Sequence, residues 1–84
     1  MNNKILVLVY VPLLEASFEF YIPINKKIGT IKNTLISFVQ KEYGFSIKDT
    51  GSVSIIDKET GNVLNEDIFV FDSTIRNGTK ILLI

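Results

Sequence analysis

Apolar residues concentrate at the two ends of the chain. Residues 4–11 and 80–84 are apolar at nearly every position, which is typical of strands in the middle of a sheet. Residues 16–22 instead alternate, so that Phe18 and its apolar neighbours share one face. The solvent-facing side of this second strand is expected to carry Ser17, Glu19 and Tyr21. Pro12 lies between the first two segments and cannot donate to a central ladder, so an antiparallel hairpin is predicted.

One amphipathic helix is predicted over residues 30–43. Its apolar face consists of Ile31, Leu35, Phe38 and Val39. Its opposite face consists of Lys32, Asn33, Ser37, Gln40 and Lys41. We expect Thr30 to cap the start of the helix with its hydroxyl, and Gly44 to take the left-handed conformation that ends many helices. The single apolar stripe implies that the helix packs on one face of the sheet.

The second half of the chain predicts short strands and turns. Residues 52–57 and 62–64 are expected to be the third and fourth strands, joined by a turn in which Gly61 takes a positive φ. Residues 68–75 are expected to form an irregular segment or a short 3₁₀ turn. The expected anchors of that segment are Phe69, Phe71 and Ile75. Residues 76–79 then turn the chain into its last strand.

The predicted order of elements is therefore ββαββ, a 3₁₀ segment and a final strand. Because the first and last strands are the most apolar, we expect both at the centre of the sheet, side by side and parallel. This arrangement is an α+β fold of the β-grasp type, a mixed five-stranded sheet with one helix packed across one face. No repeat or linker divides the sequence, so residues 1–84 are expected to form a single domain.

The amino-acid composition argues against several classes of function. Nine Lys and Arg residues balance nine Asp and Glu residues, so no basic surface for nucleic acid is expected. The sequence contains no Cys and no His, which excludes disulfides and thiolate-bound zinc and removes the commonest general base and metal ligand. We therefore do not expect nucleic acid as a partner.

The carboxylates do not indicate a catalytic or metal site either. Asp57 and Glu59 flank a predicted turn, but they supply only the opening fragment of a calcium loop, which needs several oxygen ligands. Glu66 and Asp67 lie in a loop and are expected to be solvated. No Gly-rich phosphate loop is present. We expect no enzymatic activity, no metal and no cofactor.

The apolar run 5–14 has two interpretations. It follows a basic residue, Lys4, as in a signal peptide, but no small-residue cleavage site is clear and an alternating strand follows at once. It is also shorter than the ~20 apolar residues that a transmembrane helix needs. We favour the first strand of a cytoplasmic domain that does not insert into a membrane.

Two segments resemble the ubiquitin-like superfamily. Thr30-Ile31-Lys32 is similar to the start of the ubiquitin helix. Residues 71–83 are similar to the leucine-aspartate, isoleucine, short-turn and final-strand pattern that ends ubiquitin-like domains. The resemblance covers essentially the whole chain in element order and spacing. It implies a ubiquitin-like β-grasp fold whose open sheet face receives protein partners.

Within this superfamily the chain most resembles the small bacterial YukD/EsaB-like proteins. The similar features are the compact size, Ile31-Lys32-Asn33 at the start of the helix and a chain that ends on its last strand. This resemblance implies an accessory or regulatory component of type VII secretion in Gram-positive bacteria.

The end of the sequence departs from the conjugating members of the superfamily. Ubiquitin and the sulfur carriers end in a flexible Gly-Gly tail, whereas this sequence stops at Leu82-Leu83-Ile84. We therefore do not expect conjugation or sulfur transfer unless the natural chain continues. A sulfur or acyl carrier whose Gly-Gly tail is missing remains the alternative.

One helix can cover only one face of the predicted sheet, so the other face meets solvent. The first and last strands are apolar on both sides, and alternation turns one apolar set outward whichever register holds. The set expected to face the helix is Ile5, Val7, Val9, Ile81 and Leu83. The outward set, and therefore the predicted protein-binding site, is Leu6, Leu8, Tyr10, Leu82 and Ile84. The opposite register, in which the two sets exchange, remains open.

We predict that this outward face binds a protein partner, because exposed apolar patches commonly mark interfaces. The chain would then be a non-catalytic interaction module, an adaptor or regulator. Two alternatives remain: a structural subunit that forms a homodimer through the same face, or coverage of the face by the first loop or by residues 65–75.

Overall fold

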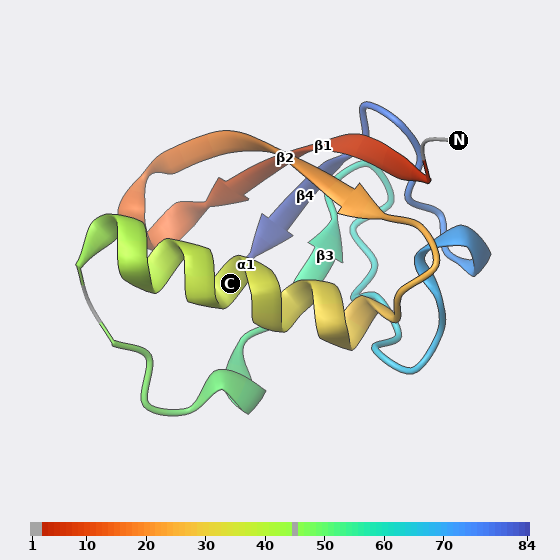
Figure 1. Ribbon diagram of the computed structural model, residues 1–84. Coiled ribbons are helices and arrows are strands. Elements are labelled where there is room, and N and C mark those ends of the chain that lie inside the picture. Colours follow the sequence, from red (N-terminus) through yellow and green to blue (C-terminus); the bar gives the residue numbers. More distant parts are fainter. Residues whose placement is uncertain (1–2, 45) are drawn as a thin grey trace.

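The computed structural model describes residues 3–44 and 46–84 (Figure 1). Its strands and α-helix are β1 (Lys4–Val11), β2 (Ala16–Pro23), α1 (Ile28–Tyr43), β3 (Ile55–Asp57) and β4 (Lys80–Leu83). Short 3₁₀ turns occupy Pro12–Leu14, Thr50–Ser52 and Val70–Asp72. Among the described residues no helix is long and apolar enough to cross a membrane.

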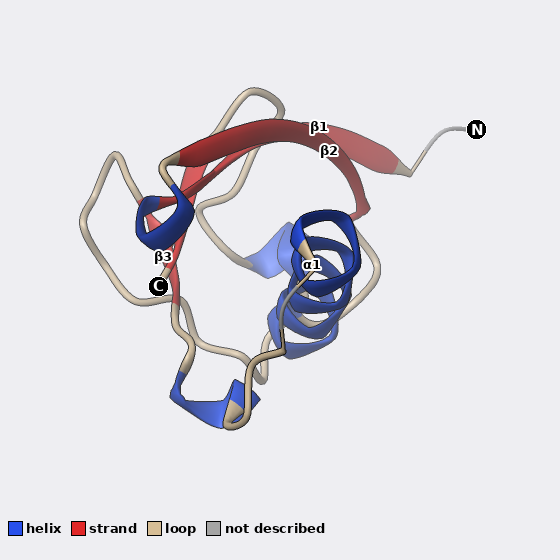
Figure 2. Cartoon of the chain, turned by 90° about the vertical axis from the view of Figure 1, so that its left-hand side faces the viewer, coloured by secondary structure: helices blue, strands red, loops and turns tan. Residues whose placement is uncertain are grey.

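The first and last strands lie side by side in the centre of the sheet. The strand order is β2-β1-β4-β3, with β1 antiparallel to β2 and parallel to β4. Val9 is the partner of Ile81 across the parallel pair. This pairing confirms the prediction drawn from the two apolar ends of the sequence. Figure 2 shows α1 lying across one face of the sheet.

The sheet has four strands in the described part of the chain, so the prediction of five was wrong. Residues 62–64 make one isolated bridge, between Val63 and Ile56, and the Leu64 amide donates to the Ile55 carbonyl at 2.9 Å. Polar residues flank this segment and Val63 is 64% exposed. Only Leu64 is buried, and a single buried side chain does not hold a full strand against the sheet.

The third strand is also shorter than predicted because a side chain diverts the backbone before it. The Asp49 carboxylate accepts a hydrogen bond from the Gly51 amide at 3.1 Å, and the Ser52 hydroxyl donates to the Asp49 carbonyl at 2.8 Å. These local bonds favour a 3₁₀ turn over a strand. Strand β3 therefore begins only at Ile55.

The helix begins two residues before the predicted cap. Lys27 is its N-cap residue and makes no side-chain capping bond, so the prediction that Thr30 caps the helix was wrong. The free amides of the first turn are satisfied by another segment instead: Ile28 donates to the Ile68 carbonyl and Gly29 donates to the Glu66 carbonyl, each at 2.9 Å. Gly44 ends the helix at a φ of 70°, as predicted.

The core lies between α1 and the inner face of the sheet. Its strand members include Val7, Val9, Ile22, Ile55, Ile81 and Leu83. Its helix members include Ile28, Ile31, Leu35, Ile36 and Val39. Phe38 is only half-buried and packs against Phe18 and Phe20, with ring centroids 4.9 and 5.3 Å away.

The segment before the last strand is anchored differently from the prediction. Ile75 is 1% exposed, as expected, but Phe69 and Phe71 are exposed and stack on each other with centroids 5.3 Å apart. The fully buried residue is Val70, between them. The 3₁₀ turn points Val70 inward, so its two aromatic neighbours are left at the surface.

Candidate protein-binding face of the sheet

The outer face of β1 carries large apolar side chains that α1 does not cover. Val7 and Val9 are completely buried on the helix side, whereas Leu6, Leu8 and Tyr10 alternate with them and are half-buried. On β4 the same alternation buries Ile81 and Leu83 and leaves Leu82 half-buried. The central strands therefore have the register that we favoured from the sequence.

Strand pairing brings four of the five predicted site residues together. Leu6, Leu8 and Tyr10 follow one another on the outer side of β1, and Tyr10 lies directly beside Leu82 of β4. Ile84 follows β4 and is 52% exposed. It lines a separate apolar pocket of about 180 Å³ with Leu13 and Leu83, at the end of the sheet.

The neighbouring strands add residues that the sequence did not assign to the site. Leu8 lies between Glu19 of β2 and Lys80 of β4 in the strand register. Ile56 of β3 pairs with Leu82 and extends the apolar surface to the far edge of the sheet. Alternation alone predicts that Glu19 faces outward, but the strand register is needed to place it beside Leu8.

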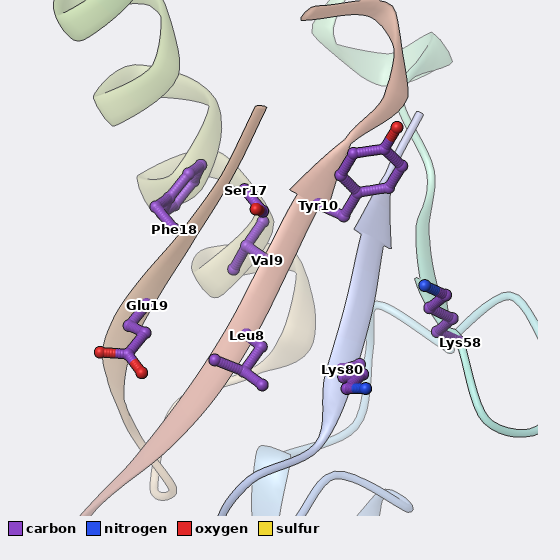
Figure 3. A pocket seen from close by; sticks show the side chains of 8 residues that line it. All are labelled: Leu8, Val9, Tyr10, Ser17, Phe18, Glu19, Lys58 and Lys80. Atoms are coloured by element: carbon purple, nitrogen blue, oxygen red, sulfur yellow. The ribbon is translucent and has the colours of Figure 1, made fainter. Parts of the chain in front are cut away.

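A shallow depression of about 380 Å³ lies on this face. Figure 3 shows Leu8 and Tyr10 at its centre, with Glu19 on the β2 side and Lys80 and Lys58 on the opposite side. The Lys58 ammonium lies 5.8 Å from the centroid of the Tyr10 ring, within the range of a cation–π contact. The depression is thus apolar in the middle and oppositely charged at its two sides.

Two of the acidic residues considered as metal or catalytic candidates, Asp57 and Glu66, have structural roles in the fold. Asp57 is 2% exposed, and its carboxylate accepts hydrogen bonds from the Glu59 amide at 2.9 Å and the Thr74 hydroxyl at 2.6 Å. It therefore closes its own turn and ties that turn to the segment before β4. In the described part of the chain no three His, Cys, Asp or Glu residues gather as a metal site would require.

Glu66 and Lys32 also differ from their predicted positions. Lys32 belongs to the predicted solvent face of the helix, but its side chain is only 4% exposed. Its ammonium donates to the Glu66 carboxylate at 2.9 Å and to the Val53 carbonyl at 3.0 Å. The prediction that Glu66 is simply solvated was wrong, because its carboxylate pairs with Lys32, whose ammonium joins α1 to two loops.

No protein-family model matches the sequence, and no curated protein matches it. Solved structures, however, share its fold over nearly the whole chain. A chain of the MycP5-free ESX-5 inner membrane complex matches with a TM-score of 0.78 at 13% identity, covering 99% of this chain and 21% of that one. The ubiquitin of Caldiarchaeum subterraneum matches with a TM-score of 0.73 at 11% identity, covering 95% and 90%.

A ubiquitin-like domain from Arabidopsis thaliana gives a similar result, with a TM-score of 0.72 at 15% identity and coverage of 99% of this chain and 78% of that one. At such identities the likeness shows the fold alone. The chain has the ubiquitin-like β-grasp fold, with one helix and a mixed four-stranded sheet. This fold supports many functions, so the function must be argued from the open face of the sheet.

Proposed function

We propose that this domain is a non-catalytic adaptor or regulator that binds a protein partner through the open face of its sheet. The observation that carries the proposal is the row of half-buried apolar side chains on the uncovered side of the two central strands. These side chains are Leu6, Leu8, Tyr10 and Leu82. An ordinary solvated sheet face would place polar residues at these positions.

The chemistry of the face suits recognition of a protein surface. Fully burying a large apolar side chain is worth about 1.5–3 kcal/mol, and each half-buried residue of this row retains part of that free energy for a partner. Because association itself costs at least about 4 kcal/mol, the apolar row needs additional polar contacts to give useful affinity. Glu19, Lys58 and Lys80 stand around the row and can supply them.

The specific version of the proposal is an accessory role in type VII secretion, in the cytoplasm of a Gram-positive bacterium. It is supported by the resemblance of the helix start, Ile31-Lys32-Asn33, to the YukD/EsaB-like proteins. It is also supported by the fold shared with part of a chain in the ESX-5 inner membrane complex. A domain of this fold therefore occurs in a chain of that inner membrane complex.

Affinity capture with matched variants tests the proposed face. Wild-type bait is compared with Leu8→Asp, on the face, and with Leu13→Asp, which makes the same change at an 86% exposed leucine outside the face. Circular dichroism first checks that each bait is folded, and Leu8→Ser replaces Leu8→Asp if that variant is not. We expect wild type and Leu13→Asp to capture the same partner, and the folded Leu8 variant to lose it.

The proposal is wrong if the folded Leu8 variant keeps the partner. If Leu13→Asp loses the partner in that case, the binding surface lies at the end of the sheet instead. Addition of purified partner to each variant, followed by calorimetry, separates a loss of affinity from a loss of expression.

A further inference from the structure

The charges on the open face are arranged across the strands rather than along them. In the row through Leu8, Glu19 lies on the β2 side and Lys80 on the β4 side. Lys58 continues the row beyond Lys80, since its amide donates to the Lys80 carbonyl at 3.0 Å. Figure 3 shows the acidic side chain on one side of Leu8 and the two basic side chains on the other.

The next row along the strands has no charge. It runs from Ser17 through Tyr10 and Leu82 to Ile56. Within the described residues, the structure gives Glu19, Lys58 and Lys80 no ion pair of their own. The face therefore combines an uncharged cross-strand row through Tyr10 and Leu82 with an adjacent row through Leu8 that is negative at one end and positive at the other.

This arrangement is complementary to itself in one orientation. If a second copy packs face to face about a two-fold axis parallel to the strands, β2 lies over β3 of the second copy and β1 lies over its β4. Glu19 then faces Lys58 of the second copy, and Tyr10 faces its Leu82. A two-fold axis perpendicular to the strands would instead set Glu19 against Glu19 and lysine against lysine, which is unfavourable.

We propose that the open face is a homodimer interface in which the two sheets meet with their strands parallel. Tyr10 and Leu82 of each copy form its apolar centre, and reciprocal contacts between Glu19 and Lys58 flank that centre. Lys80 of each copy lies over Leu8 of the other, next to that copy's Glu19. The dimer does not depend on the proposed function, but one consequence does. Because the dimer covers the face proposed for the partner, self-association and partner binding would compete.

Charge reversal with complementation tests the dimer and its orientation together. Sedimentation equilibrium is measured up to about 1 mM, where even weak association is detected. The variants are Glu19→Lys and the double variant Lys58→Glu with Lys80→Glu. Each alone places like charges across the interface, so we expect its dissociation constant to rise at least about tenfold. An equimolar mixture of the two restores opposite charges and should form a heterodimer as tight as the wild-type dimer.

A matched control removes the effect of net charge. Glu42→Lys makes the same charge change on an exposed residue of α1, away from the sheet, and should leave dimerisation within about twofold of wild type. Raising the salt concentration should weaken the wild-type dimer and relieve the repulsion in each charge variant measured alone.

A wild-type chain that stays monomeric at the highest concentration overturns the inference. A dimer that the charge variants do not weaken, or that the mixture does not restore, also overturns it, because the copies would then meet through another face or in another orientation. The partner capture by the Leu8 and Leu13 variants is interpreted independently of the sedimentation result. If the wild-type chain is monomeric and Leu8→Asp still abolishes partner capture, the homodimer is refuted and the proposed function is not.

Discussion

The ion pair between Lys32 and Glu66 provides a sharp test of how α1 is held against the rest of the domain. The ammonium lies 2.9 Å from the carboxylate and 3.0 Å from the Val53 carbonyl. The two side chains differ greatly in exposure, 4% for Lys32 and 45% for Glu66. Removing either partner should therefore have different consequences, although both substitutions break the same ion pair.

Substitution of Glu66 by Ala leaves the Lys32 ammonium buried, with the Val53 carbonyl as its remaining partner. Breaking a fully buried pair in this way costs about 3–5 kcal/mol. Because Glu66 is nearly half-exposed, solvent already screens part of the attraction, and we expect the free energy of unfolding to fall by about 2–3 kcal/mol.

Substitution of Lys32 by Met should cost less. Methionine keeps the apolar stem in the core, no charge remains buried, and the Glu66 carboxylate can turn to water. The remaining cost is that of two hydrogen bonds in a partly buried setting, about 1 kcal/mol in total. The double variant, Lys32→Met with Glu66→Ala, should have a free energy of unfolding within about 0.5 kcal/mol of that of Lys32→Met alone. Glu66 already lacks its partner when Lys32 is replaced, so its removal adds little.

Urea unfolding followed by far-ultraviolet circular dichroism measures these differences, and the absence of Trp makes this probe preferable to fluorescence. With a slope of about 1 kcal/mol per molar urea, Glu66→Ala should lower the midpoint by about 2–3 M and Lys32→Met by about 1 M. Asp67→Ala, an exposed neighbour, should stay within about 0.5 kcal/mol of wild type. A larger destabilisation by Lys32→Met than by Glu66→Ala, or strict additivity in the double variant, would refute the reasoning.

Three further pairs of substitutions are compared by their unfolding midpoints in the same assay. Ile81→Ala should cost about 3 kcal/mol, because the residue is completely buried, whereas Leu82→Ala on the open face should cost about 1 kcal/mol or less; equal costs would contradict the assigned register. Gly44→Ala should cost about 1 kcal/mol, because a φ of 70° strains any residue with a Cβ, and Gly44→Asn should cost less; identical costs would exclude this cause. Asp57→Ala should cost about 2 kcal/mol by leaving the Glu59 amide and the Thr74 hydroxyl without their acceptor, and Glu59→Ala, with an exposed side chain, serves as the control that should change little.

The sequence predicted the centre of the sheet because continuous apolar runs and alternation are local patterns. After their exposed first lysines, β1 and β4 are buried on one side and half-covered on the other, which explains their lack of alternation. The left-handed Gly44 and Gly61 were also predictable, since Gly44 ends the helix and Gly61 lies in the turn after β3, and both positions need a positive φ. These features depend on a few neighbouring residues.

Features that depend on distant partners could not be predicted in this way. Lys32 adjoins the apolar stripe of the helix, and its burial depends on Glu66 and Val53, far away in the sequence. The start of α1 was misplaced for the same reason, because the carbonyls that satisfy its first turn belong to residues 66–68. Nothing within the helix itself indicates either interaction.

The division between local and distant information also applies to the candidate site. The apolar row on β1 and β4 follows from alternation alone, and Leu8, Tyr10 and Leu82 were found in that way. The charges beside the row come from β2, from the start of β4 and from the turn after β3, and only the strand register brings them next to Leu8.

The apolar side chains and the charges of the open face lie on different parts of the sheet, and this affects how specific its binding can be. The apolar row lies on the two central strands, whose inner residues form the core, so changes there risk the stability of the whole domain. Glu19 and Lys58 are exposed residues at the two sides of the sheet, and reversing their charges leaves the core unchanged. Since like charges across an interface suppress wrong partners, these side residues can set which surface docks and in which orientation. The apolar row supplies the contact area that all such partners would share.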